Sequence, residues 1–158
     1  MTTVELDGCS LTLEDLVLLG DDPAAQITVS KAALEKVEAS RKIVDEIVAQ
    51  KRVVYGITTG FGKFATTIVA DVEQLQLNLI RSHCAGVGPP LSPQRARRLF
   101  ALRINVLAKG HSGIRPSTIE TMMRMFNAGV VPYVPEQGTV GASGDLAPLS
   151  HLALGITG

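Results

Sequence analysis

The chain has 158 residues, enough for one folded domain, and its composition (46% hydrophobic, 19% charged) is typical of a protein with a packed core. Fifteen basic and fifteen acidic residues cancel, which gives no sign of a nucleic-acid partner or an anionic membrane surface. No apolar run approaches the roughly 20 residues of a membrane-spanning helix, and the N-terminus lacks the features of a signal peptide. Cys9 and Cys84 lie far apart without metal-ligand spacing, so we predict a cytoplasmic protein with no metal site.

The first third of the chain is predicted to form a short strand and two helices. Residues 4–6 indicate the strand, and Thr12 opens a helix over residues 12–19 with an acidic residue three positions later, as in a capping box. Ser30 opens a longer helix, on which apolar residues recur at helical spacing. Residues 55–68 are rich in glycine and threonine and show no periodicity, so we expect a loop there.

The rest of the chain is predicted to be helical, with breaks at glycine and proline. Three helices are expected from their capping residues: Asp71 with Gln74, Ser92 with Pro93, and Ser117 with Glu120. Residues 130–135 should be extended, although two prolines oppose a central strand there. Asp145 is predicted to begin a last helix with an apolar face, so the fold class is mainly α with long functional loops.

The most informative segment is residues 138–150, Gly-Thr-Val-Gly-Ala-Ser-Gly-Asp-Leu-Ala-Pro-Leu-Ser. Its tripeptide Ala142-Ser143-Gly144 can close into a ring when the Gly144 nitrogen attacks the Ala142 carbonyl and two waters are lost. Glycine permits the tight fold, alanine leaves the carbonyl uncrowded, and serine supplies the eliminated hydroxyl. The product is a methylidene-imidazolone, an electrophile that no ordinary side chain provides. A helix beginning at Asp145 would place this group at the positive end of the helix dipole.

Other motifs explain these glycines less well. Residues 141–145 resemble a nucleophile elbow, but Asp145 stands where the final glycine is required. Residues 56–63 differ from a phosphate-binding loop in glycine spacing, and Phe64 replaces the required serine or threonine. The alternative that residues 138–150 form only a glycine-rich turn before a helix is not excluded by the sequence.

Three segments together resemble the aromatic amino acid ammonia-lyase family: residues 138–151, Tyr55–Gly62 (Tyr-Gly-Ile-Thr-Thr-Gly-Phe-Gly) and Arg81–Gly88 (Arg-Ser-His-Cys-Ala-Gly-Val-Gly). They occur in the family's order and at similar spacing, and the resemblance extends from about Leu11 onward. It implies the N-terminal portion of the ammonia-lyase helical fold. Residues 1–158 would then be the N-terminal segment of a larger catalytic domain, with no internal boundary.

The resemblance also implies roles for individual residues. Ala142, Ser143 and Gly144 would form the methylidene-imidazolone, and no external cofactor is expected. Tyr55 would remove the β-proton of the substrate, although its phenol needs help to ionise near neutral pH. His83 would face the substrate ring. Gly60 would let its loop close over the site, and Asp145 would orient the tripeptide.

The pair Ser82-His83 resembles the histidine-selective members of the family, whereas tyrosine-selective and phenylalanine-selective members tend to have His-Leu and Phe-Leu. A polar lining suits an imidazole, because an apolar pocket would leave its nitrogens unpaired. The resemblance therefore implies elimination of ammonia from L-histidine to give trans-urocanate, a step of histidine catabolism. Tyrosine or phenylalanine ammonia-lyase chemistry and a 2,3-aminomutase reaction stay as alternatives.

Family members are homotetramers of several hundred residues, and their sites draw on more than one subunit. We therefore expect a homotetramer formed with the remainder of the chain, and an isolated piece of 158 residues that is inactive and poorly soluble. The alternative of another class is an inactive fragment or assembly subunit that keeps the motif without the activity.

Overall fold

The computed structural model describes residues 2–65, 69 and 71–157. The described structure is 54% helical, which confirms the mainly α prediction. The helices are α1 (Leu13–Asp21), α2 (Lys31–Ala49), α3 (Val72–His83), α4 (Pro93–Ala108), α5 (Pro116–Asn127) and α6 (Leu146–Thr157), with a 3₁₀ turn, η1 (Gly62–Phe64). The strands are β1 (Thr3–Leu6), β2 (Gln26–Val29), β3 (Val87–Pro90) and β4 (Pro135–Gln137).

Most helices begin where their capping residues predict. The Thr12 side chain and the Asp15 side chain form a reciprocal capping box at α1. Ser30 caps α2 and Ser92 caps α4, each through a hydroxyl that accepts a backbone N–H three residues later. Asp71 caps α3 in the same way, but the Gln74 side chain bonds Asn78 rather than completing a box.

The predicted capping box at Ser117 is wrong. Helix α5 begins at Pro116, and the residue before it, Arg115, makes no side-chain capping bond. Proline suits the first helical position because its φ is already helical and it has no N–H to satisfy. Ser117 consequently lies inside the first turn, where its carbonyl accepts a hydrogen bond of 2.9 Å from the Thr121 hydroxyl.

Two small sheets join distant parts of the chain. β1 pairs in parallel with β2, from Thr3 opposite Gln26 to Leu6 opposite Val29. β3 pairs antiparallel with β4, with an irregularity between Val87 and Pro90. Proline fits both strands because a two-stranded sheet has only edges. The extended segment predicted at 130–135 thus becomes a strand only at its end.

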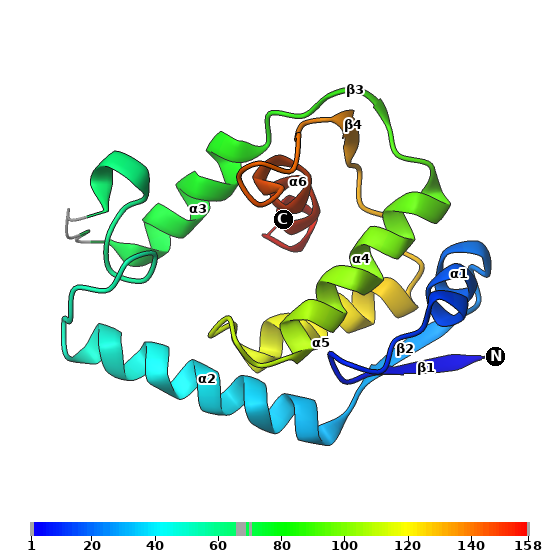
Figure 1. Cartoon of the computed structure of the whole chain (residues 1–158), viewed down its shortest axis with the longest axis horizontal. Coiled ribbons are helices and arrows are strands. Elements are labelled where there is room, and N and C mark those ends of the chain that lie inside the picture. The colour runs from blue at the N-terminus through cyan, green and yellow to red at the C-terminus, as the bar shows by residue number, and fades with distance from the viewer. Residues whose placement is uncertain (1, 66–68, 70, 158) are drawn as a thin grey trace.

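The main core lies where β1, β2, α1, α4 and α5 meet, on the side of the molecule where the N-terminus is marked in Figure 1. Its largest fully buried side chains include Leu6, Leu19, Ile27, Phe100, Ile104 and Phe126. The rings of Phe100 and Phe126 pack at 5.9 Å between centroids. The core therefore fixes α4 and α5, and the remaining elements are arranged around this pair.

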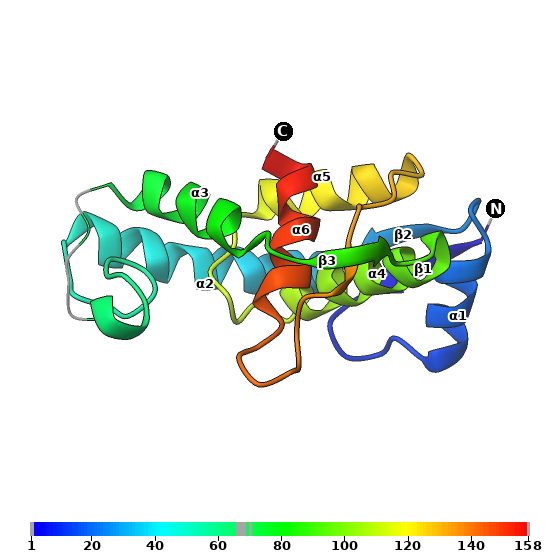
Figure 2. The same ribbon diagram turned by 90° about the horizontal axis from the view of Figure 1, so that it is seen from above.

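Helix α6 stands across the direction of the other long helices, as Figure 2 shows. It packs against α3, and the loop that precedes it projects from one end. None of the helices in the described part of the chain combines the length and apolar character needed to cross a bilayer.

Candidate functional site

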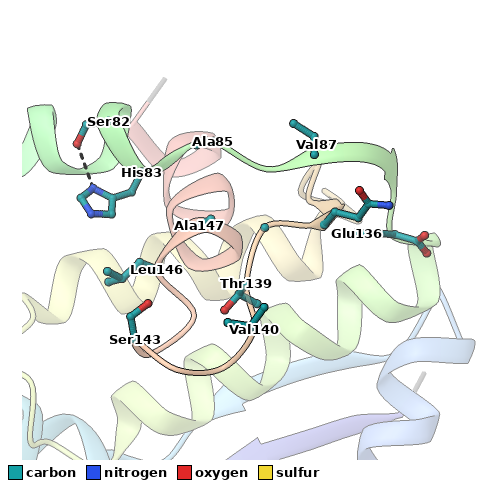
Figure 3. A pocket seen from close by; sticks show the side chains of 12 residues that line it. Ser82, His83, Ala85, Val87, Glu136, Thr139, Val140, Ser143, Leu146 and Ala147 are labelled. Atoms are coloured by element: carbon teal, nitrogen blue, oxygen red, sulfur yellow. Dashed lines mark hydrogen bonds between the residues drawn. The ribbon is translucent and has the colours of Figure 1, made fainter.

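An open cavity of about 820 Å³ lies between the end of α3, the β4 strand and the start of α6. Its lining consists of Ser82, His83, Ala85, Val87, residues 136–140, Ser143, Leu146 and Ala147. His83 and Ser143 both line this cavity although 60 residues separate them in the chain, and Figure 3 shows them on facing segments. Its size falls in the range of small-molecule sites.

A hydrogen-bond network fixes the His83 ring. Nδ1 lies 2.9 Å from the Leu79 carbonyl oxygen and 3.0 Å from the Ser82 hydroxyl, which itself donates to the same carbonyl at 3.1 Å. A carbonyl only accepts, so the contact with Leu79 favours the neutral tautomer that carries its hydrogen on Nδ1. This tautomer makes Nε2 the acceptor nitrogen, available to a donor group of a ligand.

The 142–144 tripeptide lies in a tight, exposed loop before α6. Gly141, Gly144 and Asp145 all have left-handed backbone, with φ of 76°, 88° and 56°. Glycine adopts this conformation without penalty, and aspartate is one of the few other residues that tolerate it. A Cβ at Gly144 would meet no atom within 4 Å, so the requirement for glycine is conformational rather than steric. These residues fit the precursor of a methylidene-imidazolone, and Ser143 faces the cavity.

Asp145 precedes α6 as predicted, and its carbonyl accepts the first helical hydrogen bond, from Leu149. Its carboxylate turns back to the loop instead, where Oδ1 accepts a hydrogen bond of 2.8 Å from the Thr139 hydroxyl. The same hydroxyl accepts the Gly141 N–H at 3.1 Å. The sequence interpretation missed Thr139; its signal is a threonine two residues before a turn glycine.

A second missed contact holds α6 against the segment after α3. His151 Nε2 accepts the Gly86 N–H at 3.1 Å. An added Cβ at Gly86 would lie 3.1 Å from that nitrogen and 3.1 Å from the Pro135 Cβ. A Cβ at Gly138 would lie 3.2 Å from the Ala147 Cβ. These two glycines let β3, β4 and α6 approach closely enough to form one wall of the cavity.

The structure does not bring Tyr55 to this cavity. Its side chain is 61% exposed on the loop between α2 and α3, with its ring 5.8 Å from that of Phe61. Gly60 is buried in the same loop, where its carbonyl accepts the Thr59 hydroxyl at 3.0 Å. In Figure 1 this loop lies beyond the start of α3, whereas the cavity lies at the end of that helix. Residues 66–68 of the predicted loop lie outside the described residues.

Two further titratable side chains, Cys84 and Glu136, lie beside or at the rim of the cavity. Burial raises the pKa of the Cys84 thiol, which disfavours the nucleophilic thiolate. Glu136, at the rim of the cavity, is held in an ion pair of 2.9 Å with Arg95. No cluster of metal-ligating side chains occurs among residues 2–65, 69 and 71–157.

The helical fold and the glycine-rich loop define a class of protein, and comparison with known proteins identifies that class. The model of the aromatic amino acid lyase family matches residues 11–158, so the chain belongs to that family.

Individual members of this family show which proteins the chain is similar to. The histidine ammonia-lyase of Bos taurus is 60% identical over 98% of this chain, which spans 24% of that protein. The crystal structure of histidine ammonia-lyase from Trypanosoma cruzi superposes with a TM-score of 0.89 at 55% identity, over 98% of this chain and 29% of that one. Tyrosine aminomutase from Streptomyces globisporus gives a TM-score of 0.87 at 39% identity, over 96% and 28%. The chain thus spans between 24% and 29% of the length of these relatives.

Proposed function

We propose that the protein containing this chain is a carbon–nitrogen lyase that eliminates ammonia from L-histidine and forms trans-urocanate. The observation that carries the proposal is the shared cavity of His83 and Ser143. High identity to histidine ammonia-lyases supports the same substrate. The cytoplasmic location expected from cysteine usage stays a prediction.

The electrophile is proposed to come from Ala142, Ser143 and Gly144. When formed, this group supplies a site for the substrate amine that turns the amine into a better leaving group. The start of α6 directly follows it, and the unpaired N–H groups of a helix N-terminus stabilise negative charge developing nearby. The chain's own contribution is therefore a preorganised electrostatic environment.

His83 is proposed to orient the substrate ring. With its hydrogen held on Nδ1, Nε2 accepts an N–H from the substrate imidazole. A phenyl ring has no such donor and would leave Nε2 without a partner. Histidine is favoured over phenylalanine on this ground.

Tyr55 is proposed as the base that removes the substrate β-proton. Because it lies on another loop, it must reach the substrate through closure of that loop or in a site completed by another subunit. The glycine at position 60 would serve such a closure. We accordingly propose a homotetramer, with residues 1–158 as the N-terminal segment of a larger catalytic domain.

A second candidate is an aminomutase or a lyase acting on tyrosine or phenylalanine, which the likeness to tyrosine aminomutase favours. It would share the electrophile and differ in the pocket. An inactive assembly subunit is a further alternative.

The experiment offers L-histidine, L-tyrosine and L-phenylalanine separately to the complete protein and follows conjugated product by near-ultraviolet absorbance, with β-amino acids measured by chromatography. We expect product from histidine alone, and none from a Ser143→Ala variant. Conjugated product from another amino acid would overturn the proposal that histidine is the substrate. A β-amino acid product would identify an aminomutase. No turnover of any of the three amino acids would support the inactive assembly subunit.

A further inference from the structure

We infer that Thr139 is a positioning residue for formation of the electrophile: its hydroxyl ties the two arms of the 139–145 loop and holds the tripeptide in a shape ready to close. This inference rests on the proposed function and extends it to a residue outside the tripeptide. Figure 3 shows Thr139 and Ser143 on opposite arms of the loop.

The Thr139 hydroxyl both donates and accepts a hydrogen bond inside this loop. It accepts the Gly141 N–H at 3.1 Å and donates to Asp145 Oδ1 at 2.8 Å. These are the only side-chain hydrogen bonds recorded for residues 138–145, all of which are described. A donor that is itself accepting a hydrogen bond is polarised, so the two bonds reinforce each other.

The bond to Asp145 closes a ring of chain around residues 140–144. Asp145 sits in left-handed backbone, which costs a non-glycine residue free energy unless surrounding contacts hold it there. The hydrogen bond to its carboxylate supplies such a contact immediately after the tripeptide. On the other arm, the bond to the Gly141 N–H fixes the residue immediately before the tripeptide. Both ends of the reacting segment are therefore held by one hydroxyl.

Ring closure is an intramolecular reaction whose rate depends on such restraint. A bond forms between the Gly144 nitrogen and the Ala142 carbonyl carbon. The first water takes the Ala142 carbonyl oxygen and the hydrogens of the Gly144 and Ser143 nitrogens. The second takes the Ser143 hydroxyl and its Cα hydrogen, with no change in oxidation state overall. A tripeptide whose ends are fixed spends more of its time near the attacking geometry.

The test compares the complete protein as wild type, Thr139→Val and Thr139→Ser. Valine keeps the shape and removes the hydroxyl, whereas serine restores it. Each is made by cell-free synthesis, and intact mass is followed over time for the loss of two waters. Thr121→Val is the matched control, since Thr121 is also a threonine with two hydrogen bonds but lies in α5.

We expect Thr139→Val to lose its waters about tenfold more slowly, the effect of one hydrogen bond to a charged acceptor. Thr139→Ser and Thr121→Val should follow wild type. Equal rates for wild type and Thr139→Val would overturn the role of Thr139 alone. A wild type that keeps its encoded mass would overturn this role together with the proposed function. If Thr139→Val does not fold, slow closure in a folded Thr139→Ser protein would still contradict the inference.

Discussion

At the scale of single residues, His83 and Tyr55 differ in how firmly neighbouring groups hold their side chains. His83 is held by the Leu79 carbonyl and the Ser82 hydroxyl, so its ring is oriented before any ligand arrives. The Tyr55 ring is exposed. Among the aromatic rings described, only that of Phe61 packs against it, in an edge-on arrangement. A recognition residue benefits from this preorganisation, whereas a base on a closing loop must be able to move.

Replacing Tyr55 by phenylalanine removes only the phenol oxygen. If Tyr55 is the base, kcat for histidine in the complete protein should fall by about 10²- to 10⁴-fold, the usual contribution of a general base. Binding of histidine should change little, because the ring stays. Tyr133→Phe is the matched control, as Tyr133 is the chain's other tyrosine and is similarly exposed. Similar kcat values for both variants would exclude Tyr55 from proton transfer.

At the scale of elements, the sequence predicts those features that local chemistry decides. Thr12, Ser30 and Ser92 begin helices because each supplies an acceptor to an N–H three residues along. Ser117 fails because a proline directly before it already defines the helix start. The pairing of β1 with β2 was not predicted, since it depends on contacts across some 20 residues that no local pattern reports.

In the candidate site, too, local sequence predicts some features and tertiary contacts decide the others. The resemblance to the ammonia-lyase family indicated both His83 and Ser143, but only the packing of α3 against α6 brings them to one cavity. The hydrogen bonds of Thr139 to Asp145 and of His151 to Gly86 could not be predicted from the sequence, because the folding of the loop and of α6 selects these partners. Tyr55 was expected at the site, and its position in the described structure leaves that role a prediction.

The wall made by β3, β4 and α6 should be sensitive to a single methyl group at Gly86. Gly86→Ala would push against His151 and Pro135 and weaken the hydrogen bond from the N–H of residue 86 to His151 Nε2, lowering the free energy of unfolding by about 1–3 kcal/mol. Urea unfolding of the complete protein measures this effect. Gly155→Ala is the control, because a Cβ there meets nothing within 4 Å. If both variants unfold at the same urea concentration, the proposed close packing at Gly86 is wrong.

At the scale of the whole molecule, Arg97 links elements that are distant in sequence. It is 4% exposed, donates to the backbone carbonyls of Leu19 and Ala25 at 3.0 and 3.2 Å, and stacks 4.3 Å above the Phe126 ring. Burial lowers its pKa, although an arginine stays charged. Arg97 thus joins α4 to α1, to the residue just before β2 and to α5 through one side chain.

Arg97→Met keeps most of the apolar length and leaves these buried carbonyls without donors. We expect the free energy of unfolding to fall by about 3 kcal/mol, the scale of two unpaired buried acceptors. Arg124→Met, at an exposed position on α5, should change it by less than about 0.5 kcal/mol. Chemical denaturation of the complete protein compares the two, and equal stabilities would show that Arg97 is not a structural link.

The 158 residues alone expose large apolar side chains, among them Val140 at 95%, Leu13 at 77% and Tyr133 at 65%. They also span only 24% of the Bos taurus relative. We expect this piece, expressed alone, to bind a hydrophobic dye, to aggregate on size-exclusion chromatography and to release no ammonia from histidine. A monodisperse piece that turns over histidine would contradict the need for the remaining chain.

Residues 142–144 are proposed to form the electrophile, and the mass of the peptide spanning residues 138–150, obtained by digesting the complete protein, shows whether they do. We predict that this peptide lacks two waters relative to its encoded mass. In Ser143→Ala the alkene cannot form, so at most one water can be lost. A wild-type peptide of full encoded mass, from protein that still consumes histidine, would show that the chemistry resides elsewhere.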